Sequence, residues 1–113
     1  MKHLVIIGAV WPEPNSTAAG SRMLQIIALF QNQDYEITFL CSASKSDFSF
    51  DLNTISVQTK TIQLNDSSFD DEIAALNPNV VLFDRFMIEE QYGWRVTENC
   101  PNALRILDTE DLH

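Results

Sequence analysis

The first third of the chain alternates between apolar runs and a stretch of helical periodicity. Residues 3–9 (HLVIIGA) are continuously apolar after the histidine, which is typical of a parallel strand buried on both faces. A proline-containing loop follows, and Ser16 or Thr17 is placed to cap a helix over Ala18–Gln31. Apolar residues recur in this segment at helical spacing, so one side of the helix is expected to pack on a sheet. Tyr35–Cys41 (YEITFLC) then predicts a second strand.

The rest of the chain repeats this alternation. Residues 42–53 are polar and predict a loop or a single helical turn, whereas the rough alternation over Thr54–Leu64 predicts a half-exposed edge strand. Two helices and two strands are expected after it. They are a helix at Asp66–Leu76, a strand at Val80–Phe83 that ends at Asp84, a helix at Phe86–Glu98 and a strand at Ala103–Leu107.

Strands that alternate with helices favour a Rossmann-like, doubly wound α/β fold in a single domain. Right-handed crossovers give its parallel sheet the strand order 3-2-1-4-5. They also place the first helix on one face of the sheet and the two later helices on the other. Because a single helix is expected on the first face, we expect apolar side chains of the first, fourth and fifth strands to stay partly exposed there. We therefore expect the chain either to form a homodimer through this incompletely covered face or to be poorly soluble alone.

The composition limits the classes of function. The chain has 16 acidic and 7 basic residues in 113, and its net charge of -9 disfavours a nucleic-acid partner because phosphates repel an acidic surface. No apolar run reaches the roughly 18 to 20 residues that a transmembrane helix needs, and no cleavable leader is predicted. Cys41 and Cys100 fall at opposite ends of the predicted sheet, so both are expected to be reduced and far apart. A cytoplasmic protein is expected.

Open parallel sheets bind ligands beyond the carboxyl ends of their strands, near the point where the strand order reverses. The loop after the first strand lacks the GxGxxG pattern, but it places Ala18, Ala19 and Gly20 at a helix N-terminus. A phosphate or carboxylate could approach there, with Arg22 adding a positive charge. The alternative is a capped helix whose small residues pack against the sheet. Gly20 favours the ligand interpretation, because glycine within a helix costs about 1 kcal/mol relative to alanine.

Charged residues also follow the fourth strand. Asp84 and Arg85 come directly after the buried run VVLF, where a binding site is expected. The alternative is a structural role, in which Asp84 caps the following helix and Arg85 pairs with Glu89 one turn later. The sequence leaves both interpretations open.

The last six residues form the densest polar group in the chain. Asp108, Glu110, Asp111 and His113 are suited to general-base catalysis or to binding a cation. The alternative is a loop of solvated acids. The spacing matches no zinc pattern, so no structural metal is expected.

Two segments resemble a group of bacterial glycosyltransferases of the two-domain GT-B type. One is the run FDRFMIEEQYGWRVTENCPNALRILDTEDLH at residues 83–113, and the other is PEPNSTAAGSR at residues 12–22. Together they cover somewhat more than a third of the chain, and the five-strand pattern extends the likeness to the rest. The longer motif is the more specific of the two.

The resemblance implies an enzyme of two Rossmann-like domains that transfers a hexose-type sugar from a nucleotide-sugar to an acceptor hydroxyl. The nucleotide-sugar is a co-substrate, and no other cofactor is implied. In this group the N-terminal domain holds the sugar or glycan acceptor and often supplies the catalytic base, while the loop after the first strand approaches the donor phosphates. The candidate catalytic residues are Asp84, Asp108 and His113. The candidates for donor-phosphate or acceptor binding are Ser16, Ala18, Ala19, Gly20, Arg22, Arg85, Glu110 and Asp111.

The sequence departs from this group in two places. The first loop lacks the paired glycines that are common in it, and Asp84-Arg85 stands where many relatives have a histidine. We expect the chain to be the acceptor-side half of such an enzyme, without its donor domain and without transfer activity alone. Two alternatives are a free-standing flavodoxin-like module that binds a small anion or nucleotide, and an interaction domain with no ligand. The first predicts ligand binding by the isolated chain, and the second predicts tight self-association.

Overall fold

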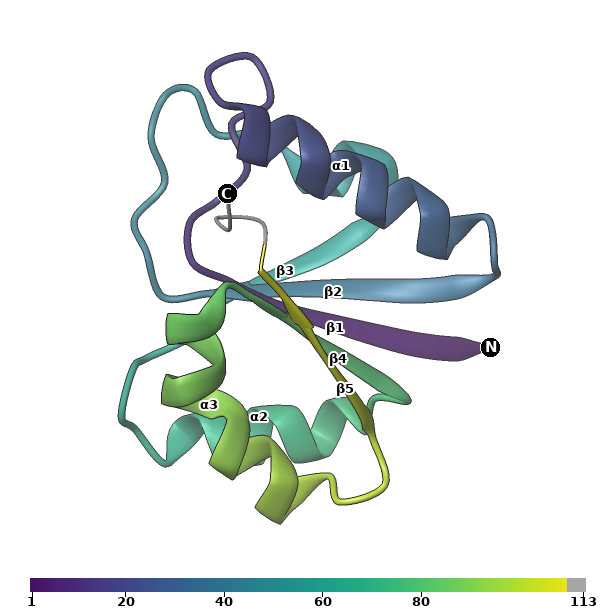
Figure 1. Cartoon of the computed structure of the whole chain (residues 1–113), viewed down its shortest axis with the longest axis vertical. Helices are drawn as coiled ribbons and strands as arrows, with labels where there is room; N and C mark the ends of the chain where they lie inside the picture. The colour runs from purple at the N-terminus through teal and green to yellow at the C-terminus, as the bar shows by residue number, and fades with distance from the viewer. Residues whose placement is uncertain (110–113) are drawn as a thin grey trace.

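A computed structural model describes residues 1–109 of the chain and shows a five-stranded parallel sheet with helices on both faces (Figure 1). The strand order is β3-β2-β1-β4-β5, as predicted. The strands are β1 (Lys2–Gly8), β2 (Tyr35–Cys41), β3 (Val57–Thr61), β4 (Val80–Asp84) and β5 (Leu104–Asp108). The helices are α1 (Ala18–Gln31), α2 (Ser68–Leu76) and α3 (Phe86–Asn99), with a 3-10 turn, η1, at Leu52–Ile55.

The centre of the sheet is β1, which pairs with β2 on one side and with β4 on the other. Successive side chains of a strand point to opposite faces, so a strand covered on both faces must be apolar throughout. Leu4 and Ile6 lie in the core under α1, whereas Val5 and Ile7 lie in the core under α2 and α3. The run at residues 3–9 is continuously apolar because β1 contributes side chains to the cores on both faces of the sheet.

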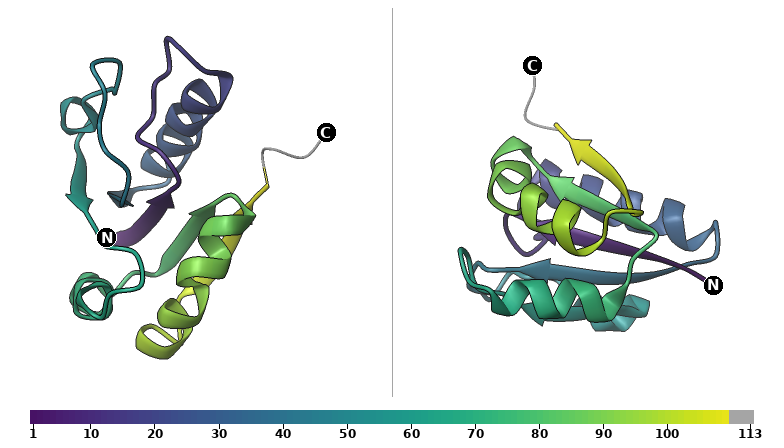
Figure 2. Two further views of the ribbon diagram at one scale, coloured as in Figure 1. Left: turned by 90° about the vertical axis from the view of Figure 1, so that its left-hand side faces the viewer. Right: turned by 90° about the horizontal axis from the view of Figure 1, so that it is seen from below.

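The helices lie on the two faces of the sheet as predicted, α1 on one face and α2 and α3 on the other (Figure 2). On one face α1 packs through Met23 and Ile27, together with Trp11 from the first loop. On the other face α2 and α3 pack side by side, and a contact between the rings of Phe69 and Tyr92 joins them. Within residues 1–109, no helix combines the length and the apolar character needed to cross a membrane.

The strand expected over Thr54–Leu64 is shorter than predicted. Its first part belongs to η1, where the Asp51 side chain accepts a hydrogen bond from the Asn53 N–H. Ser56 ends this turn with φ 65 and ψ 30, a left-handed conformation that a strand cannot contain. The pairing of β3 with β2 therefore begins only at Val57. The Asp51 cap thus stabilises a helical turn where the weak alternation of apolar and polar residues predicted a strand.

The face that was expected to be incompletely covered is mostly covered. Leu4 and Ile6 of β1 are fully buried, and Val80 and Leu82 of β4 are at most 5% exposed, because the first loop extends the cover provided by α1. Exposure is confined to the edge strand β5, where Leu104 is 60% exposed. The expectation of exposed side chains on the first and fourth strands is thus wrong. Pairing of two copies stays a prediction, now limited to β5.

The two cysteines lie in different cores. Cys41 ends β2 on the face covered by α1, whereas Cys100 follows α3 on the opposite face. Both are buried and free, which confirms that they do not pair. Burial raises the pKa of both thiols; at Cys41 a backbone hydrogen bond from Ala43 partly opposes this effect and the Asp84 carboxylate adds to it.

We expect both thiols to react with iodoacetamide much more slowly in the folded chain than in denaturant. Thiolate is the reactive species, so a raised pKa lowers the reactive fraction at mildly alkaline pH, and burial blocks access. Mass spectrometry after timed alkylation measures the two rates. A disulfide-linked species, or rapid labelling of the native chain, would contradict this topology.

Candidate functional site

The carboxyl ends of β1 and β4 form the point at which the chain order of the sheet reverses. The connection from β1 crosses one face of the sheet through α1, and the connection from β4 crosses the other face through α3. The loops that leave these two strands separate and leave a space between them. A pocket of about 300 Å³ occupies this space. Its lining comes from the first loop, the first turns of α1 and the end of β4: Val10, Trp11, Pro12, Glu13, Thr17, Ala19, Gly20, Met23, Asp84 and Arg85.

The first loop is held in place by contacts with the loop that follows β2. The buried indole of Trp11 donates from Nε1 to the carbonyl of Ala43 at 2.7 Å, and its ring packs against Phe39. The backbone N–H of Phe50 donates to the carbonyl of Pro12 at 2.9 Å. These contacts fix the wall of the pocket independently of any ligand.

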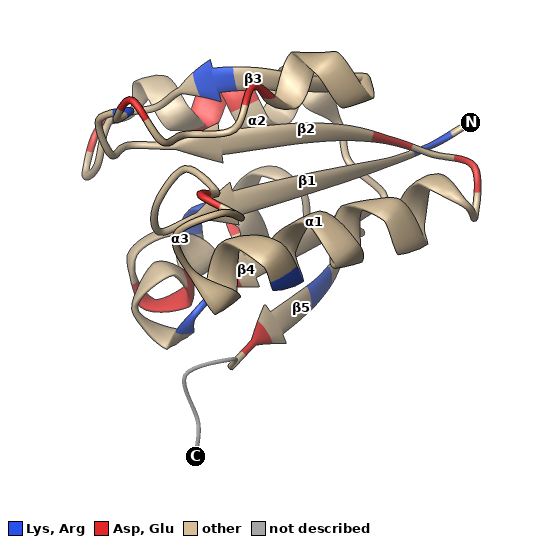
Figure 3. Ribbon diagram, turned by 90° about the horizontal axis from the view of Figure 1, so that it is seen from above, with Lys and Arg blue, Asp and Glu red and all other residues tan. Residues whose placement is uncertain are grey.

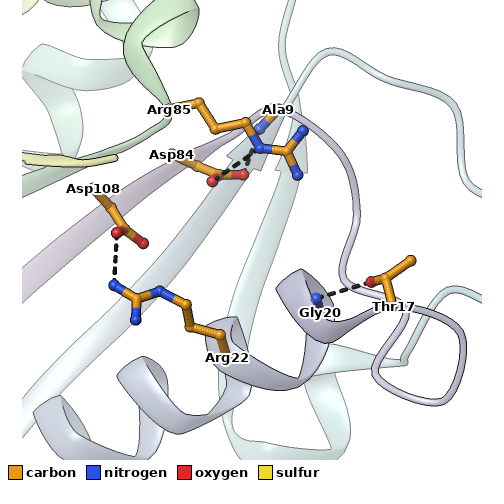
Figure 4. Close-up of polar contacts among 7 residues, drawn as sticks. All are labelled: Ala9, Thr17, Gly20, Arg22, Asp84, Arg85 and Asp108. Atoms are coloured by element: carbon orange, nitrogen blue, oxygen red, sulfur yellow. Dashed lines mark hydrogen bonds and ion pairs between the residues drawn. The ribbon is translucent and has the colours of Figure 1, made fainter. Parts of the chain in front are cut away.

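The first turn of α1 is capped by its own loop. Thr17 is the N-cap residue, and its Oγ1 accepts a hydrogen bond from the Gly20 N–H at 2.9 Å (Figure 4). The carbonyl of Glu13 accepts from the N–H groups of Ser16 and Thr17, both at 2.9 Å. This geometry confirms the predicted helix cap and identifies Thr17, rather than Ser16, as its residue. Ala18 is exposed beside it.

Gly20 is small because the loop packs directly on it. A Cβ at this position would lie 2.6 Å from the backbone N and C of Glu13, a separation that real Cβ atoms do not show. The absence of a side chain therefore lets the loop fold over the first turn of α1. The packing interpretation accounts for this glycine without a ligand.

Asp84 ends β4 with its carboxylate turned toward the first loop (Figure 4). It is only 4% exposed, and its Oδ2 accepts the backbone N–H of Ala9 at 3.1 Å. Its Oδ1 lies 3.5 Å from Nε of Arg85. The N-cap position of α3 is held by Arg85, so the alternative in which Asp84 caps that helix is wrong.

A second ion pair lies beside Asp84. Strand register places Asp108 opposite Asp84, and an Arg22 Nη2 donates to Asp108 Oδ1 at 2.8 Å. Figure 3 shows the basic position on α1 next to the acidic end of β5. The backbone N–H of Arg85 also donates to the Asp108 carbonyl at 2.9 Å. Four candidates from three segments that are distant in sequence are thus brought together.

Arg85 has an unusual backbone conformation. Its φ of 82 and ψ of 156 fall in a region that is occupied almost only by glycine. Holding a larger residue there costs on the order of 1–3 kcal/mol, and such strain concentrates at binding and catalytic sites. This backbone conformation turns the chain sharply from β4 into α3 and places Arg85 at the edge of the pocket.

Arg85→Gly is expected to raise the free energy of unfolding by about 1 kcal/mol, as measured by urea denaturation. Glycine adopts the native conformation without strain, although its greater freedom in the unfolded chain and the lost arginine contacts offset part of the gain. The matched control is Ser56→Gly, at a left-handed position with φ 65 and ψ 30, where a smaller gain is expected. A marked loss of stability in Arg85→Gly would show that the arginine side chain holds the fold.

The structure gathers some predicted residues and not others. Ala19, Gly20, Asp84 and Arg85 line the pocket, whereas Arg22 and Asp108 form the adjacent ion pair. Glu110, Asp111 and His113 lie outside the described residues. Among residues 1–109, no group of three His, Cys, Asp or Glu side chains is placed to hold a metal ion.

Six lining residues were not among the site candidates: Val10, Trp11, Pro12, Glu13, Thr17 and Met23. The available signal was the WPEP segment itself, because an aromatic residue and an acid directly after a buried strand fall at the carboxyl edge. Met23 was expected only to face the sheet, and it also reaches the pocket.

No protein-family model matches the chain, and no curated protein matches it.

Proposed function

We propose that the chain is the acceptor-side domain of a nucleotide-sugar-dependent glycosyltransferase of the GT-B type, and that the pocket at the ends of β1 and β4 holds the acceptor. One observation carries this proposal: a buried carboxylate, Asp84, lines a small-molecule-sized pocket at the switch point of a Rossmann-like sheet. The resemblance of residues 12–22 and 83–113 to such enzymes supports it, because these segments supply seven of the ten lining residues.

The proposed reaction is attack of an acceptor hydroxyl on the anomeric carbon of the donor sugar. A new glycosidic bond forms, the bond from the anomeric carbon to the phosphate oxygen breaks, and the nucleoside diphosphate leaves. The proton of the hydroxyl passes to a carboxylate that acts as general base. Asp84 is the first candidate because it lines the pocket, and Asp108 lies on the next strand.

The donor is the second element of the proposal. A nucleotide-sugar is larger than a pocket of about 300 Å³, which is at the lower end of the range for small-molecule sites. In the proposed enzyme a second Rossmann-like domain holds the nucleotide, and the hexose-type sugar meets the acceptor between the two domains. A cytoplasmic setting is part of this proposal, because nucleotide-sugars are the donors.

Two measurements test the proposal. The reading frame that encodes the chain is expected to continue into a second Rossmann-like domain, and the complete protein is expected to transfer sugar to an acceptor while the 113-residue chain alone does not. A stop codon directly after residue 113, combined with nucleotide binding by the isolated chain, would instead favour a free-standing binding module. Tight self-association without any ligand would favour an interaction domain.

A further inference from the structure

The outer side of α3 exposes large apolar side chains. Met87 and Trp94 are 65% and 51% exposed, and they lie about two helical turns apart on the same side of the helix. Phe86, at the start of α3, is exposed as well. Leu107 of the edge strand β5 is exposed on the sheet face that α3 covers, since its register partner Phe83 lies in the core under α2 and α3. Apolar side chains that are grouped on one surface, rather than scattered singly, mark sites of interaction.

Two exposed carboxylates share this side of α3. Glu90 and Glu98 lie one turn before and one turn after Trp94, and residues four apart on a helix are neighbours on its surface. Within residues 1–109 neither carboxylate belongs to an ion pair. We call Met87, Glu90, Trp94 and Glu98 the α3 stripe. Figure 2 shows α3 beside β5 on the outside of the molecule, so a partner can reach the stripe.

The indole in the middle of the α3 stripe already receives one cation. The guanidinium of Arg95 lies 4.4 Å from the centroid of the Trp94 ring. Arg95 is also paired with Asp70 at 2.8 Å, so its charge is balanced on the side of α2 and not by the acids of the stripe. A lysine or arginine side chain of a partner would meet a carboxylate and the edge of an aromatic system within one helical turn.

The negative charge of the α3 stripe disfavours three other partners. Nucleic acids and anionic lipid headgroups carry phosphates, which the two carboxylates repel. A second copy of the chain presents the same acids and a net charge of -9, so two stripes facing each other also repel. A basic amphipathic helix fits instead, because its apolar side chains cover Met87 and Trp94 while its cations pair with Glu90 and Glu98.

We infer that the α3 stripe, with Phe86 and Leu107 beside it, binds a cationic amphipathic helix of a partner protein. The surface shares no residue with the lining of the pocket at the ends of β1 and β4. The inference therefore goes beyond the proposed function and does not depend on it.

The test is a fluorescence titration of the 113-residue chain at low ionic strength with three synthetic peptides of about 18 residues, a length that can form a helix. One peptide has leucine and lysine in amphipathic helical order, the second has glutamate in place of lysine, and the third is oligolysine. Trp94 reports binding, because Trp11 is buried against Phe39. The leucine–lysine peptide is expected to shift the emission of Trp94 to shorter wavelength, with saturation. It is expected to bind at least about tenfold more tightly than the other two, because it alone supplies both apolar area and positive charge.

The double variant Glu90→Gln, Glu98→Gln removes both charges and keeps good helix-forming residues. It is expected to weaken binding of the leucine–lysine peptide about three- to tenfold, as for the loss of two exposed ion pairs. The matched control is Glu36→Gln with Asp47→Asn, which makes the same change in net charge at exposed positions on and after β2. It is expected to leave the affinity within about twofold of wild type.

Trp94→Gln tests the apolar part of the α3 stripe, with calorimetry in place of fluorescence. It is expected to weaken binding at least about fivefold, because both buried area and the cation–π contact are lost. The matched control is Leu29→Gln, which removes a similarly exposed side chain from α1 on the other face of the sheet. Its affinity is expected to match that of wild type.

Four results would overturn the inference. They are the absence of saturable binding, tighter binding of the leucine–glutamate peptide, equal weakening by a stripe variant and its control, and tighter binding of Trp94 to vesicles of phosphatidylcholine and phosphatidylglycerol than to the leucine–lysine peptide. Sedimentation of the chain without peptide adds one more arm: a dimer that Trp94→Gln dissociates would make the occupant a second copy and would also overturn it. None of these results bears on sugar transfer, so the proposed function stands or falls separately.

Discussion

Asp84→Asn is expected to lower the transfer rate of the complete enzyme by about 10²- to 10⁴-fold, the usual effect of removing a general base. The amide of asparagine can still accept the Ala9 N–H, so the first loop and the fold are expected to remain intact. The loss should therefore appear in kcat rather than in stability. Steady-state kinetics with saturating donor measures it.

The matched control is Asp70→Asn, which removes a carboxylate from an ion pair with Arg95 on the other face of the sheet. Its transfer rate is expected to stay near that of wild type. Asp108→Asn is the second site variant, because Asp108 lies opposite Asp84 and is held by Arg22. If both Asp84→Asn and Asp108→Asn keep nearly full activity, the base lies elsewhere and the proposed role of this strand edge is wrong.

Gly20→Ala is expected to lower the free energy of unfolding by about 1–3 kcal/mol, as overpacking does in a close-packed region. The same change in an unobstructed helix would stabilise it by up to about 1 kcal/mol. At Gly20 the added Cβ meets the backbone of Glu13 at 2.6 Å, and a backbone segment pinned by the Thr17 cap cannot move aside cheaply. Urea denaturation of both proteins measures the difference.

Gly93→Ala is the matched control in α3. There the nearest atom to an added Cβ is the carboxylate oxygen of Glu89, at the free end of a flexible side chain that can turn away. A neutral or stabilising change is expected at this position. If Gly20→Ala were also neutral or stabilising, the close packing of the first loop on α1 would be contradicted, and with it the structural reason for a glycine at this position.

Much of the fold could be predicted from residue patterns. The bounds of α1 and β2 agree with the sequence, because a capping threonine and clear apolar periodicity act in the same direction as tertiary packing. The region before β3 could not be predicted. Its alternation is weak, and the Asp51 cap and the left-handed Ser56 are local features that the apolar pattern does not reveal.

The site could be predicted in part. The carboxyl-edge rule led to Asp84, Arg85 and Asp108, because it depends only on strand order and direction. It could not predict that Gly20 serves the packing of Glu13, since this contact depends on the path of the WPEP loop. The strained conformation of Arg85 was equally hidden, because nothing in the residue type indicates it.

Mapping where a neutral sugar binds tests the central claim most directly. Amide NMR of the chain with methyl glucoside compares the pocket at the ends of β1 and β4 with the larger groove of about 640 Å³ at the amino end of the sheet. The proposed acceptor site predicts saturable shifts at the Trp11 indole N–H and the Gly20 amide. Shifts confined to Phe30 and Tyr35, which line the amino-end groove, would contradict it.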